Sequence, residues 1–341
     1  MDKIVLLGKT MPELKLLSEE LGLPKFAARQ IADWLYKKNV DSVEQMTNIS
    51  LANRNKISER CVVGKSLPEN VMVSADGTKK YLFRVQDKFV EAVYIPEKDR
   101  ATLCVSSQVG CKMNCLFCMT GKQGFGCSLT SGEILNQMQA IPEFDKLTNV
   151  VFMGMGEPMD NVKNVLAALE IMTSDYGYAW SPKRVTVSTV GIVPGMREFL
   201  QKSSCHLAVS LHNPFPDERL AMMPIEKAYS IVDVLSEIRK YDFTGQRRVS
   251  FEYTMFKGKN DTPRHAAELK RLLDGLECRM NLIRFHSIPD VPLEGSSDDE
   301  IEKFQSELSK RGVLATIRKS RGEDIFAACG LLSTMKKNNE L

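Results

Sequence analysis

Long apolar runs are absent from this sequence. No segment approaches the 18 or more consecutive apolar residues that a membrane-spanning helix needs. The N-terminal stretch MDKIVLLGKTMPELKLL also lacks the form of a secretory signal, because its apolar run is short and acidic residues follow at once. We therefore expect a cytoplasmic protein that has no membrane partner.

Excess charge is also nearly absent. The chain has 46 Lys and Arg against 43 Asp and Glu, a net charge of +3, which is too small to indicate nucleic-acid binding by itself. Residues 1–65 hold 11 Lys and Arg against 8 Asp and Glu, so the whole surplus lies there. A polyanionic partner and a plain solvated helical face both explain this surplus, and charge alone does not separate them.

Three regions can be distinguished along the chain. Residues 1–66 read as a small helical N-terminal domain, in which Phe26, Ile31, Trp34 and Leu35 form an apolar stripe typical of core packing. Residues 67–100 alternate between apolar and polar positions around an Asp-Gly pair, which predicts a β-hairpin linker. Residues 101–335 then alternate between strand and helix patterns.

This alternation predicts an α/β fold, because parallel strands need crossover helices between them. Six units favour a partial (β/α)6 TIM-like barrel over a flat doubly wound sheet, and chemistry is then expected at the C-terminal ends of the strands. The expected strands are TLCVSS, NVVFMGM, RVTVST, HLAVSL, RVSFEYTMF and MNLIRFH. The expected helices cover about residues 131–141, 161–173, 194–202, 230–241 and 263–274.

The cysteines carry the most specific pattern. Three of the nine, Cys111, Cys115 and Cys118, lie in CKMNCLFC with C-x3-C-x2-C spacing, directly after the first strand of the alternating region. In a reducing compartment, clustered cysteines indicate metal binding or catalysis, and thiolates favour Fe–S clusters, Zn or Cu(I). A 4Fe–4S cluster held by three cysteines leaves one iron open for a substrate. A structural zinc loop is the alternative, but its fourth ligand would be Cys127, outside the usual spacing.

A second motif, GMGEP, ends the second expected strand. Gly156 lets the backbone approach a ligand closely, and Glu157 can accept hydrogen bonds from an ammonium group. Polar residues also end later strands, where hydroxyl and imidazole groups can bind a ribose, a carboxylate or a base. Each residue alone is better explained as a polar group that caps its strand or has its hydrogen bonds satisfied inside the protein, but together these residues outline one ligand. These residues are Ser188, Ser210, His212 and His286.

Long stretches of the chain resemble the RlmN-type dual-specificity radical S-adenosylmethionine (SAM) RNA methyltransferases. They are KFAARQIADWLYKK, CVSSQVGCKMNCLFCMTGKQGF, VFMGMGEPMDN, VTVSTVGIVPG, LAVSLHNP and RGEDIFAACG, and they cover nearly the whole sequence in order. The resemblance implies one 4Fe–4S cluster on Cys111, Cys115 and Cys118, and two SAM molecules consumed per methylation. It also implies SAM contacts at the motif residues above and at Leu211. One departure is Arg284-Phe285-His286, where many members have Pro-aromatic-Asn.

The resemblance also implies a methyl relay between two further cysteines. One SAM methylates Cys329, which requires a thiolate. A second SAM, cleaved at the cluster, gives a radical that takes a hydrogen from the S-methyl group, and the resulting methylene adds to carbon 2 of an adenine. Cys104 then attacks the sulfur of Cys329 and releases the RNA through a transient disulfide. Glu91 would accept the proton from carbon 2.

The implied substrates are large-subunit (23S) rRNA and tRNA, with a reductant such as flavodoxin and a monomeric enzyme. Basic side chains of the N-terminal region and Lys79-Lys80 are candidates for phosphate contact. Three alternatives remain at this point. They are a carbon-8 adenine methyltransferase of the antibiotic-resistance type, a radical-SAM protein-activating enzyme, and an RNA-binding protein with a structural zinc loop.

Overall fold

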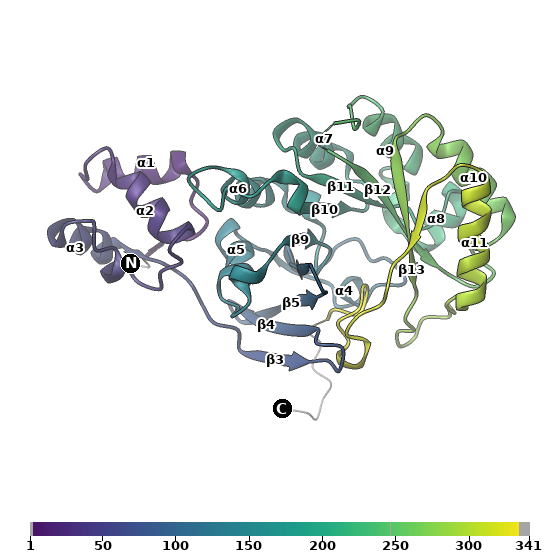
Figure 1. Ribbon diagram of the computed structural model, residues 1–341, viewed down its shortest axis with the longest axis horizontal. Helices are drawn as coiled ribbons and strands as arrows, with labels where there is room; N and C mark the ends of the chain where they lie inside the picture. Colours follow the sequence, from purple (N-terminus) through teal and green to yellow (C-terminus); the bar gives the residue numbers. More distant parts are fainter. Residues whose placement is uncertain (1–2, 246, 334–341) are drawn as a thin grey trace.

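A computed structural model describes residues 3–245 and 247–333 of the chain (Figure 1). Its centre is an open ten-stranded sheet in the order β14-β13-β12-β11-β10-β9-β6-β5-β4-β3. Seven neighbouring strands run parallel. They are β6 (Ala101–Cys104), β9 (Asn149–Phe152), β10 (Val185–Thr189), β11 (His206–Ser210), β12 (Val249–Met255), β13 (Cys278–Arg284) and β14 (Ala315–Ile317). All six expected strands are confirmed, and β14 is an addition.

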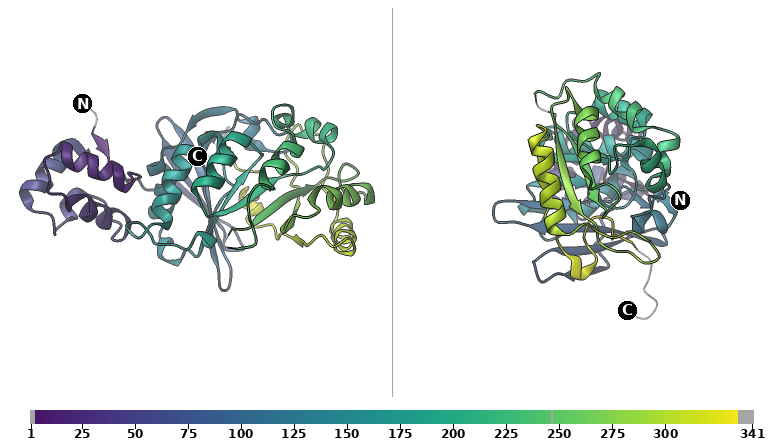
Figure 2. Two further views of the ribbon diagram at one scale, coloured as in Figure 1. Left: turned by 90° about the horizontal axis from the view of Figure 1, so that it is seen from above. Right: turned by 90° about the vertical axis from the view of Figure 1, so that its right-hand side faces the viewer.

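Helices lie between the parallel strands and cover one face of the curved sheet (Figures 1 and 2). Three of them begin with capping boxes, in which a hydroxyl and an acidic side chain satisfy free N–H groups of the first turn. The five expected helices correspond to α5 (Ser131–Gln139), α6 (Val162–Thr173), α7 (Val193–Lys202), α9 (Ile231–Ile238) and α10 (Pro263–Leu273). The sequence analysis missed α4 (Met119–Lys122), α8 (Pro216–Met222) and α11 (Asp298–Lys310).

The remaining short elements connect these units. A small antiparallel pair, β7 (Gln108–Gly110) and β8 (Phe125–Ser128), encloses the cysteine loop. The described residues also form six short 3-10 helices: η1 (Val43–Gln45), η2 (Phe144–Lys146), η3 (Pro158–Asn161), η4 (Pro182–Arg184), η5 (Pro224–Lys227) and η6 (Glu323–Ile325). No helix in the two described stretches is long and apolar enough to cross a membrane.

The N-terminal region forms a helical unit at one end of the molecule (Figure 2). It contains α1 (Met11–Glu20), α2 (Ala27–Tyr36) and α3 (Leu51–Arg60), closed by the parallel pair β1 (Ile4–Val5) and β2 (Cys61–Val62). Ile31 and Leu35 are buried as expected. The prediction that Phe26 belongs to this buried stripe is wrong. Phe26 lies just before α2 begins and is 64% exposed, so its ring is not part of the core.

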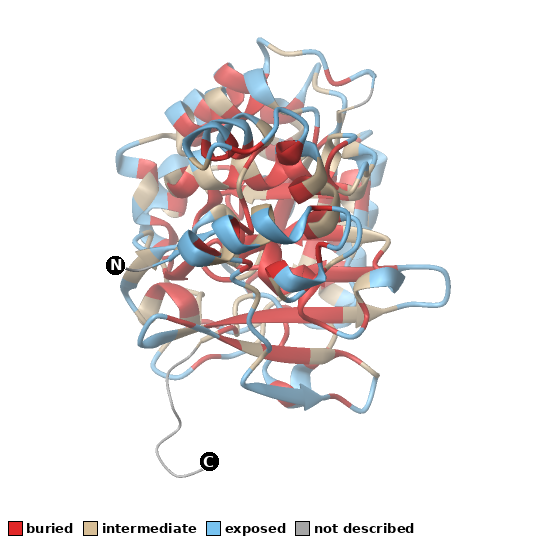
Figure 3. Cartoon of the chain, turned by 90° about the vertical axis from the view of Figure 1, so that its left-hand side faces the viewer, coloured by how far each residue is buried: buried red, intermediate tan, exposed pale blue. Residues whose placement is uncertain are grey.

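The expected hairpin is present, and it belongs to the main sheet. β3 (Asn70–Val73), β4 (Lys79–Val85) and β5 (Lys88–Pro96) are antiparallel, and β5 pairs with β6. The turn closes on Asp76, whose carboxylate accepts a hydrogen bond from the Thr78 amide at 2.9 Å. In Figure 3 the edge strand β3 is exposed, whereas β4 and β5 are largely buried. Because these strands continue the barrel sheet, the domain boundaries at residues 66 and 100 stay a prediction.

Both lysines of this hairpin pair with carboxylates. Lys80 is buried and pairs with Glu91 at 3.0 Å, and Lys79 pairs with the buried carboxylate of Glu143 at 2.7 Å. The expectation that Lys79-Lys80 contact phosphate is therefore wrong for Lys80, because its ammonium group is buried against the carboxylate of Glu91. The ammonium group of Lys79 is held by the carboxylate of Glu143.

Candidate active site

A cavity lies at the C-terminal ends of the parallel strands, as a barrel predicts. Its empty volume is about 970 Å³, which includes space open to solvent. The cysteine loop between β7 and α4 forms one wall, and the ends of β9 to β13 form the others. Of the residues expected at the site, it is lined by Cys111, Cys115, Cys118, Gly156, Glu157, Ser188, Ser210, His212 and Cys329.

The cysteine loop is tightly folded. Asn114 has a left-handed backbone with φ of 48°, which asparagine tolerates better than most residues. A Cβ on Gly121 would lie only 3.2 Å from the backbone of Asn114 and Cys115, so α4 packs directly against the loop. Burial raises the pKa of the Cys111 thiol to about 12 and raises that of Cys115 as well. These thiols therefore stay protonated near neutral pH unless a metal binds them.

The donor set of this loop fits a 4Fe–4S cluster. Three soft sulfur donors face one cavity. Cys118 raises the pKa of both Cys111 and Cys115, and Cys111 raises that of Cys115, which shows that the thiols lie near one another. Among residues 3–245 and 247–333, no three His, Cys, Asp or Glu side chains are close enough to hold a single ion. A cubane has no such requirement, because each thiolate binds a different iron. Cys127, the alternative fourth ligand, lies on β8 and is not in the cavity wall.

The loop after β9 brings a buried carboxylate to the cavity floor. Glu157 accepts hydrogen bonds from the Thr189 hydroxyl at 2.6 Å and from the Val190 amide at 2.9 Å. Burial raises its pKa to about 7. Gly156 precedes it with φ of 96°, and a Cβ there would lie 2.5 Å from the Cβ of Gln108. The glycine is therefore required by close backbone packing, and Glu157 ties the ends of β9 and β10 together.

The end of β11 supplies the opposite wall. Ser210 and His212 line the cavity together with Ser188 of β10, whereas the side chain of Leu211 is buried away from it. His212 has φ of 54°, and its Nδ1 accepts a hydrogen bond from the Thr254 amide at 2.9 Å. Burial lowers the pKa of His212 to about 3. The imidazole is therefore neutral and carries its proton on Nε2.

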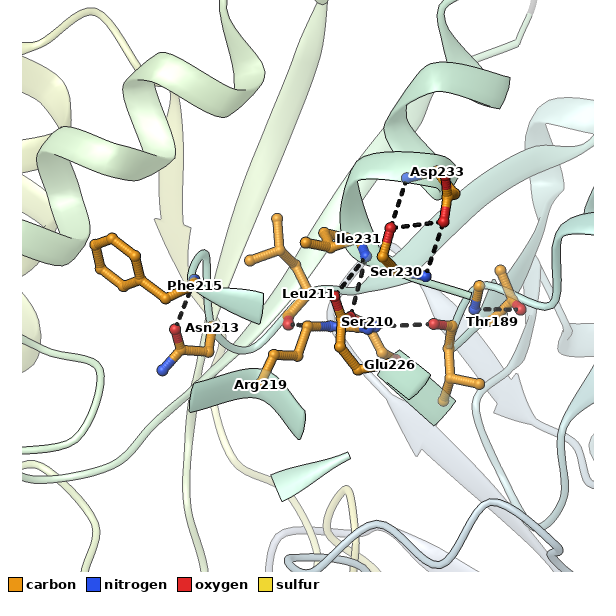
Figure 4. A network of polar contacts seen from close by, with 12 residues as sticks. Thr189, Ser210, Leu211, Asn213, Phe215, Arg219, Glu226, Ser230, Ile231 and Asp233 are labelled. Atoms are coloured by element: carbon orange, nitrogen blue, oxygen red, sulfur yellow. Dashed lines mark hydrogen bonds and ion pairs between the residues drawn. The ribbon is translucent and has the colours of Figure 1, made fainter. Parts of the chain in front are cut away.

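One buried cation, absent from the sequence analysis, holds these strand ends in place. Arg219 forms an ion pair with Glu226 and donates hydrogen bonds to the carbonyls of Val190, Ser210 and Leu211 at 2.9–3.0 Å (Figure 4). Arg219 has no exposed surface. A charged pair seven residues apart in a segment without regular periodicity gives no sequence pattern from which this role could be predicted.

The two relay cysteines lie together beside the cluster loop. Cys329 lines both the first cavity and a second one, and Cys104 at the end of β6 lines the second. Both thiols are free, with Cys104 buried and Cys329 exposed within the cavity region. Burial, together with the nearby Cys329, raises the pKa of Cys104 to about 12. The segment of Cys329 is held beside the cluster loop, since the amide of Met119, the first residue of α4, donates to the Gly330 carbonyl at 2.9 Å.

Besides Leu211 and Cys104, two expected site residues lie outside the first cavity. Glu91 is buried on β5, where it pairs with Lys80 and accepts a hydrogen bond from the Ser333 amide at 3.0 Å, and it lines neither cavity. His286 lines the second cavity and not the first, and its Nε2 is hydrogen-bonded to the Ser320 hydroxyl at 2.9 Å. The structure thus gathers nine expected residues at the first cavity and leaves Glu91, His286, Leu211 and Cys104 outside its wall.

Comparison with known proteins agrees with this architecture. Residues 105–269 match the radical SAM superfamily, and residues 4–63 match the ribosomal RNA large subunit methyltransferase N-terminal domain. A probable dual-specificity RNA methyltransferase RlmN from Bacteroides fragilis (strain YCH46) is 58% identical over 338 residues, which cover 99% of this chain and 98% of that protein. The chain belongs to the RlmN family of radical SAM RNA methyltransferases.

More distant members show the same extent of similarity. The dual-specificity RNA methyltransferase RlmN of Syntrophus aciditrophicus is 42% identical over 98% of this chain and 97% of its own length. A crystal structure of a radical SAM methyltransferase from Sphaerobacter thermophilus has a TM-score of 0.89 at 37% identity, and the match covers 96% of this chain and 99% of that one. The RlmN-family protein is thus an enzyme, and its superfamily uses a 4Fe–4S cluster and SAM.

Proposed function

We propose that this enzyme methylates carbon 2 of adenine in 23S rRNA and in tRNAs through a covalent intermediate on Cys329. The observation that carries the proposal is the position of Cys329, which lines both the cluster-loop cavity and the cavity that contains Cys104. A methyl carrier must reach SAM on one side and a resolving thiol on the other. This position meets both requirements.

The cluster would be held by Cys111, Cys115 and Cys118. When bound, it supplies the electron that cleaves SAM to a radical able to remove a hydrogen from a methyl group. SAM would contact Gly156, Glu157, Ser188, Ser210 and His212 in the first cavity, and the main chain at Leu211. For His286 the proposal requires that SAM extend into the second cavity.

The chain's own residues then carry the methyl group. The Cys329 thiolate attacks the methyl carbon of SAM, the C–S bond forms as S-adenosylhomocysteine leaves, and one hydrogen of the new S-methyl group is removed as an atom. The remaining methylene radical adds to carbon 2 of adenine, an unactivated position that polar methyl transfer does not reach. The adduct then loses the carbon 2 proton and one electron, which the cluster oxidised in the cleavage of SAM would take back. The Cys104 thiolate attacks the Cys329 sulfur, so an S–S bond forms while the bond from sulfur to the methylene carbon breaks, and this carbon takes up a proton to become the methyl group.

Glu91 is the proposed acceptor of the carbon 2 proton. Burial raises its pKa, whereas the neighbouring Lys80 lowers it. Its carboxylate is occupied by Lys80 and by the Ser333 amide. For proton transfer, the segment that carries Cys329 must release this amide when the base binds.

RNA binding is assigned to the N-terminal unit in addition to the barrel. Lys25, Lys37 and Lys38 are exposed on or beside α2, and the exposed Phe26 ring lies next to Lys25 in the chain. Cations that neutralise phosphates, together with an aromatic ring available for stacking, suit a single-stranded or looped RNA. We further propose a monomeric cytoplasmic enzyme that receives electrons from a reductant such as flavodoxin.

The test is anaerobic turnover with RNA and a reductant, followed by mass spectrometry of nucleosides. We expect 2-methyladenosine from the native enzyme, no methylated adenosine from Cys329→Ala, and a covalent protein–RNA adduct from Cys104→Ala. Cys278→Ala is the matched control, because this cysteine lines neither cavity and its replacement leaves product formation intact. Formation of 8-methyladenosine, or full activity of Cys329→Ala, would contradict the proposal.

A further inference from the structure

The two cavities meet at four side chains that line both of them. They are Met153, Glu252, Ile283 and Cys329. Because Cys329 would deliver its methylene group to the base, the target base must lie at this junction. Met153 and Ile283 are apolar and can contact the faces of a ring. Glu252 is then the charged side chain that the junction offers to the edge of a base.

Glu252 has one satisfied and one unsatisfied oxygen. It lies on β12 and is 4% exposed. Its Oε1 accepts hydrogen bonds from the Asn281 amide group at 2.7 Å and from the Ser250 hydroxyl at 3.2 Å. Its Oε2 is buried and has no hydrogen-bond partner among the described residues. Burial raises the pKa of this carboxyl and Arg318 lies near enough to lower it, but Oε2 itself accepts no hydrogen bond from the described residues. Leaving a buried acceptor without a hydrogen bond is costly, and such an acceptor in a cavity wall indicates a ligand that brings the donor.

The chemistry of the expected ligand identifies that donor. Adenine carries an amino group at carbon 6, which donates hydrogen bonds, whereas guanine and hypoxanthine carry a carbonyl there, which accepts them. A carboxylate attracts the first group and repels the second. The second cavity also carries cationic side chains that suit the phosphates of a nucleotide entering from solvent. They are Arg100, Arg318, Lys319 and Arg321.

We propose that Glu252 selects adenine, its free carboxylate oxygen accepting a hydrogen bond from the 6-amino group of the target base. The inference deepens the proposed function and rests on it, since it assumes that an adenine of RNA reaches Cys329. Glu252 is a specificity-determining residue in this account, and the chemistry of methyl transfer remains with the cysteines.

The geometry around Glu252 makes Glu252→Gln an informative variant. Asn281 and Ser250 both donate to the position of Oε1, so the glutamine must place its carbonyl oxygen there. Its NH2 group then occupies the position of Oε2 and becomes a donor. The variant should therefore lose its preference for a 6-amino group and gain tolerance for a 6-carbonyl group, a change that simple structural damage does not produce.

The test uses synthetic RNA hairpins that carry adenine, hypoxanthine or unsubstituted purine at the position that the native enzyme methylates. For the native enzyme, we expect kcat/KM to be at least about 10-fold higher for adenine than for either analogue, the effect of one hydrogen bond to a charged group. For Glu252→Gln, the ratio of adenine to hypoxanthine should fall at least about 10-fold. Fluorescence anisotropy of the cluster-free protein with the same hairpins should show the same order of affinities.

A matched control is Glu143→Gln. Glu143 is also buried and hydrogen-bonded, to Lys79 and Tyr81, but it lines neither cavity. This variant should keep the base preference of the native enzyme. If Glu252→Gln fails to fold, the comparison of adenine with purine on the native protein still decides the matter, because equal kcat/KM for the two bases overturns the proposal.

The outcomes separate this inference from the function on which it rests. A native enzyme that methylates no adenine refutes the proposed function. A native enzyme that methylates adenine, with a Glu252→Gln variant that keeps the native base ratio, refutes only the assignment of Glu252. A variant in which the KM for SAM rises while the base ratio stays unchanged places Glu252 at SAM and also overturns the proposal.

Discussion

Replacing Arg219 with methionine should destabilise the protein severely. The guanidinium lies at the ends of β10 and β11, where it pairs with Glu226 and donates to three backbone carbonyls. Methionine fills much of the same volume but donates no hydrogen bond. The variant therefore leaves a buried carboxylate without its counter-charge and three carbonyls without their donor.

The magnitude follows from the burial of both partners. The side chains of Arg219 and Glu226 are 0% and 4% exposed, and removing one partner of such a pair costs about 3–5 kcal/mol. Domains unfold with only about 5–15 kcal/mol, so this loss is a large part of the total. The pair of Arg197 with Glu237 is the comparison. Its arginine side chain is 49% exposed, and the buried carboxylate of Glu237 keeps Lys240 as a second partner at 2.8 Å when Arg197 is replaced. We therefore expect a loss within the range of about 0–1 kcal/mol of partly exposed pairs.

Urea unfolding of the cluster-free protein measures these differences. We expect Arg219→Met to lower the free energy of unfolding by about 3–5 kcal/mol and Arg197→Met by less than about 1 kcal/mol. The double variant Arg219→Met with Glu226→Leu should be more stable than Arg219→Met alone, since it removes the unpaired carboxylate. A loss below about 1 kcal/mol for Arg219→Met would refute the reasoning.

Two further predictions concern the segment that carries Cys329 and the cavity histidine. Lys80→Met removes the ion pair with Glu91 at 3.0 Å. Hydrogen exchange of the Ser333 amide, which donates to Glu91, should then accelerate. An unchanged exchange rate would show that Lys80 does not hold this segment. The pKa of His212 is lowered to about 3, so the imidazole stays neutral in the folded protein, whereas the unfolded chain gains a proton below about pH 6.5. The free energy of unfolding therefore decreases as the pH is lowered below this value, by up to about 1.4 kcal/mol per pH unit. The fall between pH 7 and 5 should be shallower in His212→Gln, and parallel curves would contradict this account.

Local patterns were sufficient to predict most of the barrel from the sequence. The six parallel strands are short apolar runs, and each precedes a helix pattern that the structure confirms except after β13. α11 follows β13 after an irregular stretch rich in Pro and Ser, and β14 has only three residues, too few for a periodicity. The N-terminal stripe was wrong at Phe26, because apolar spacing alone does not tell which end of a stripe faces solvent.

The site could be predicted from the sequence where reactive residues of one type lie close together in the chain. Cys111, Cys115 and Cys118 meet at one cavity because a short loop holds all three. Arg219 and Glu252 were missed, since their roles depend on contacts between distant strand ends that no spacing records. Glu91 was named from resemblance, and sequence could not show that its carboxylate is already occupied by Lys80 and Ser333.

The most direct test of the methyl relay uses SAM whose methyl group carries three deuterium atoms. If Cys329 holds the methyl group while a radical removes one of its hydrogens, the 2-methyladenosine product contains two of the three deuterium atoms, and 5′-deoxyadenosine gains the third. Mass spectrometry of both products gives the answer in one reaction. A product that retains all three deuterium atoms would mean direct methyl transfer and would contradict the account.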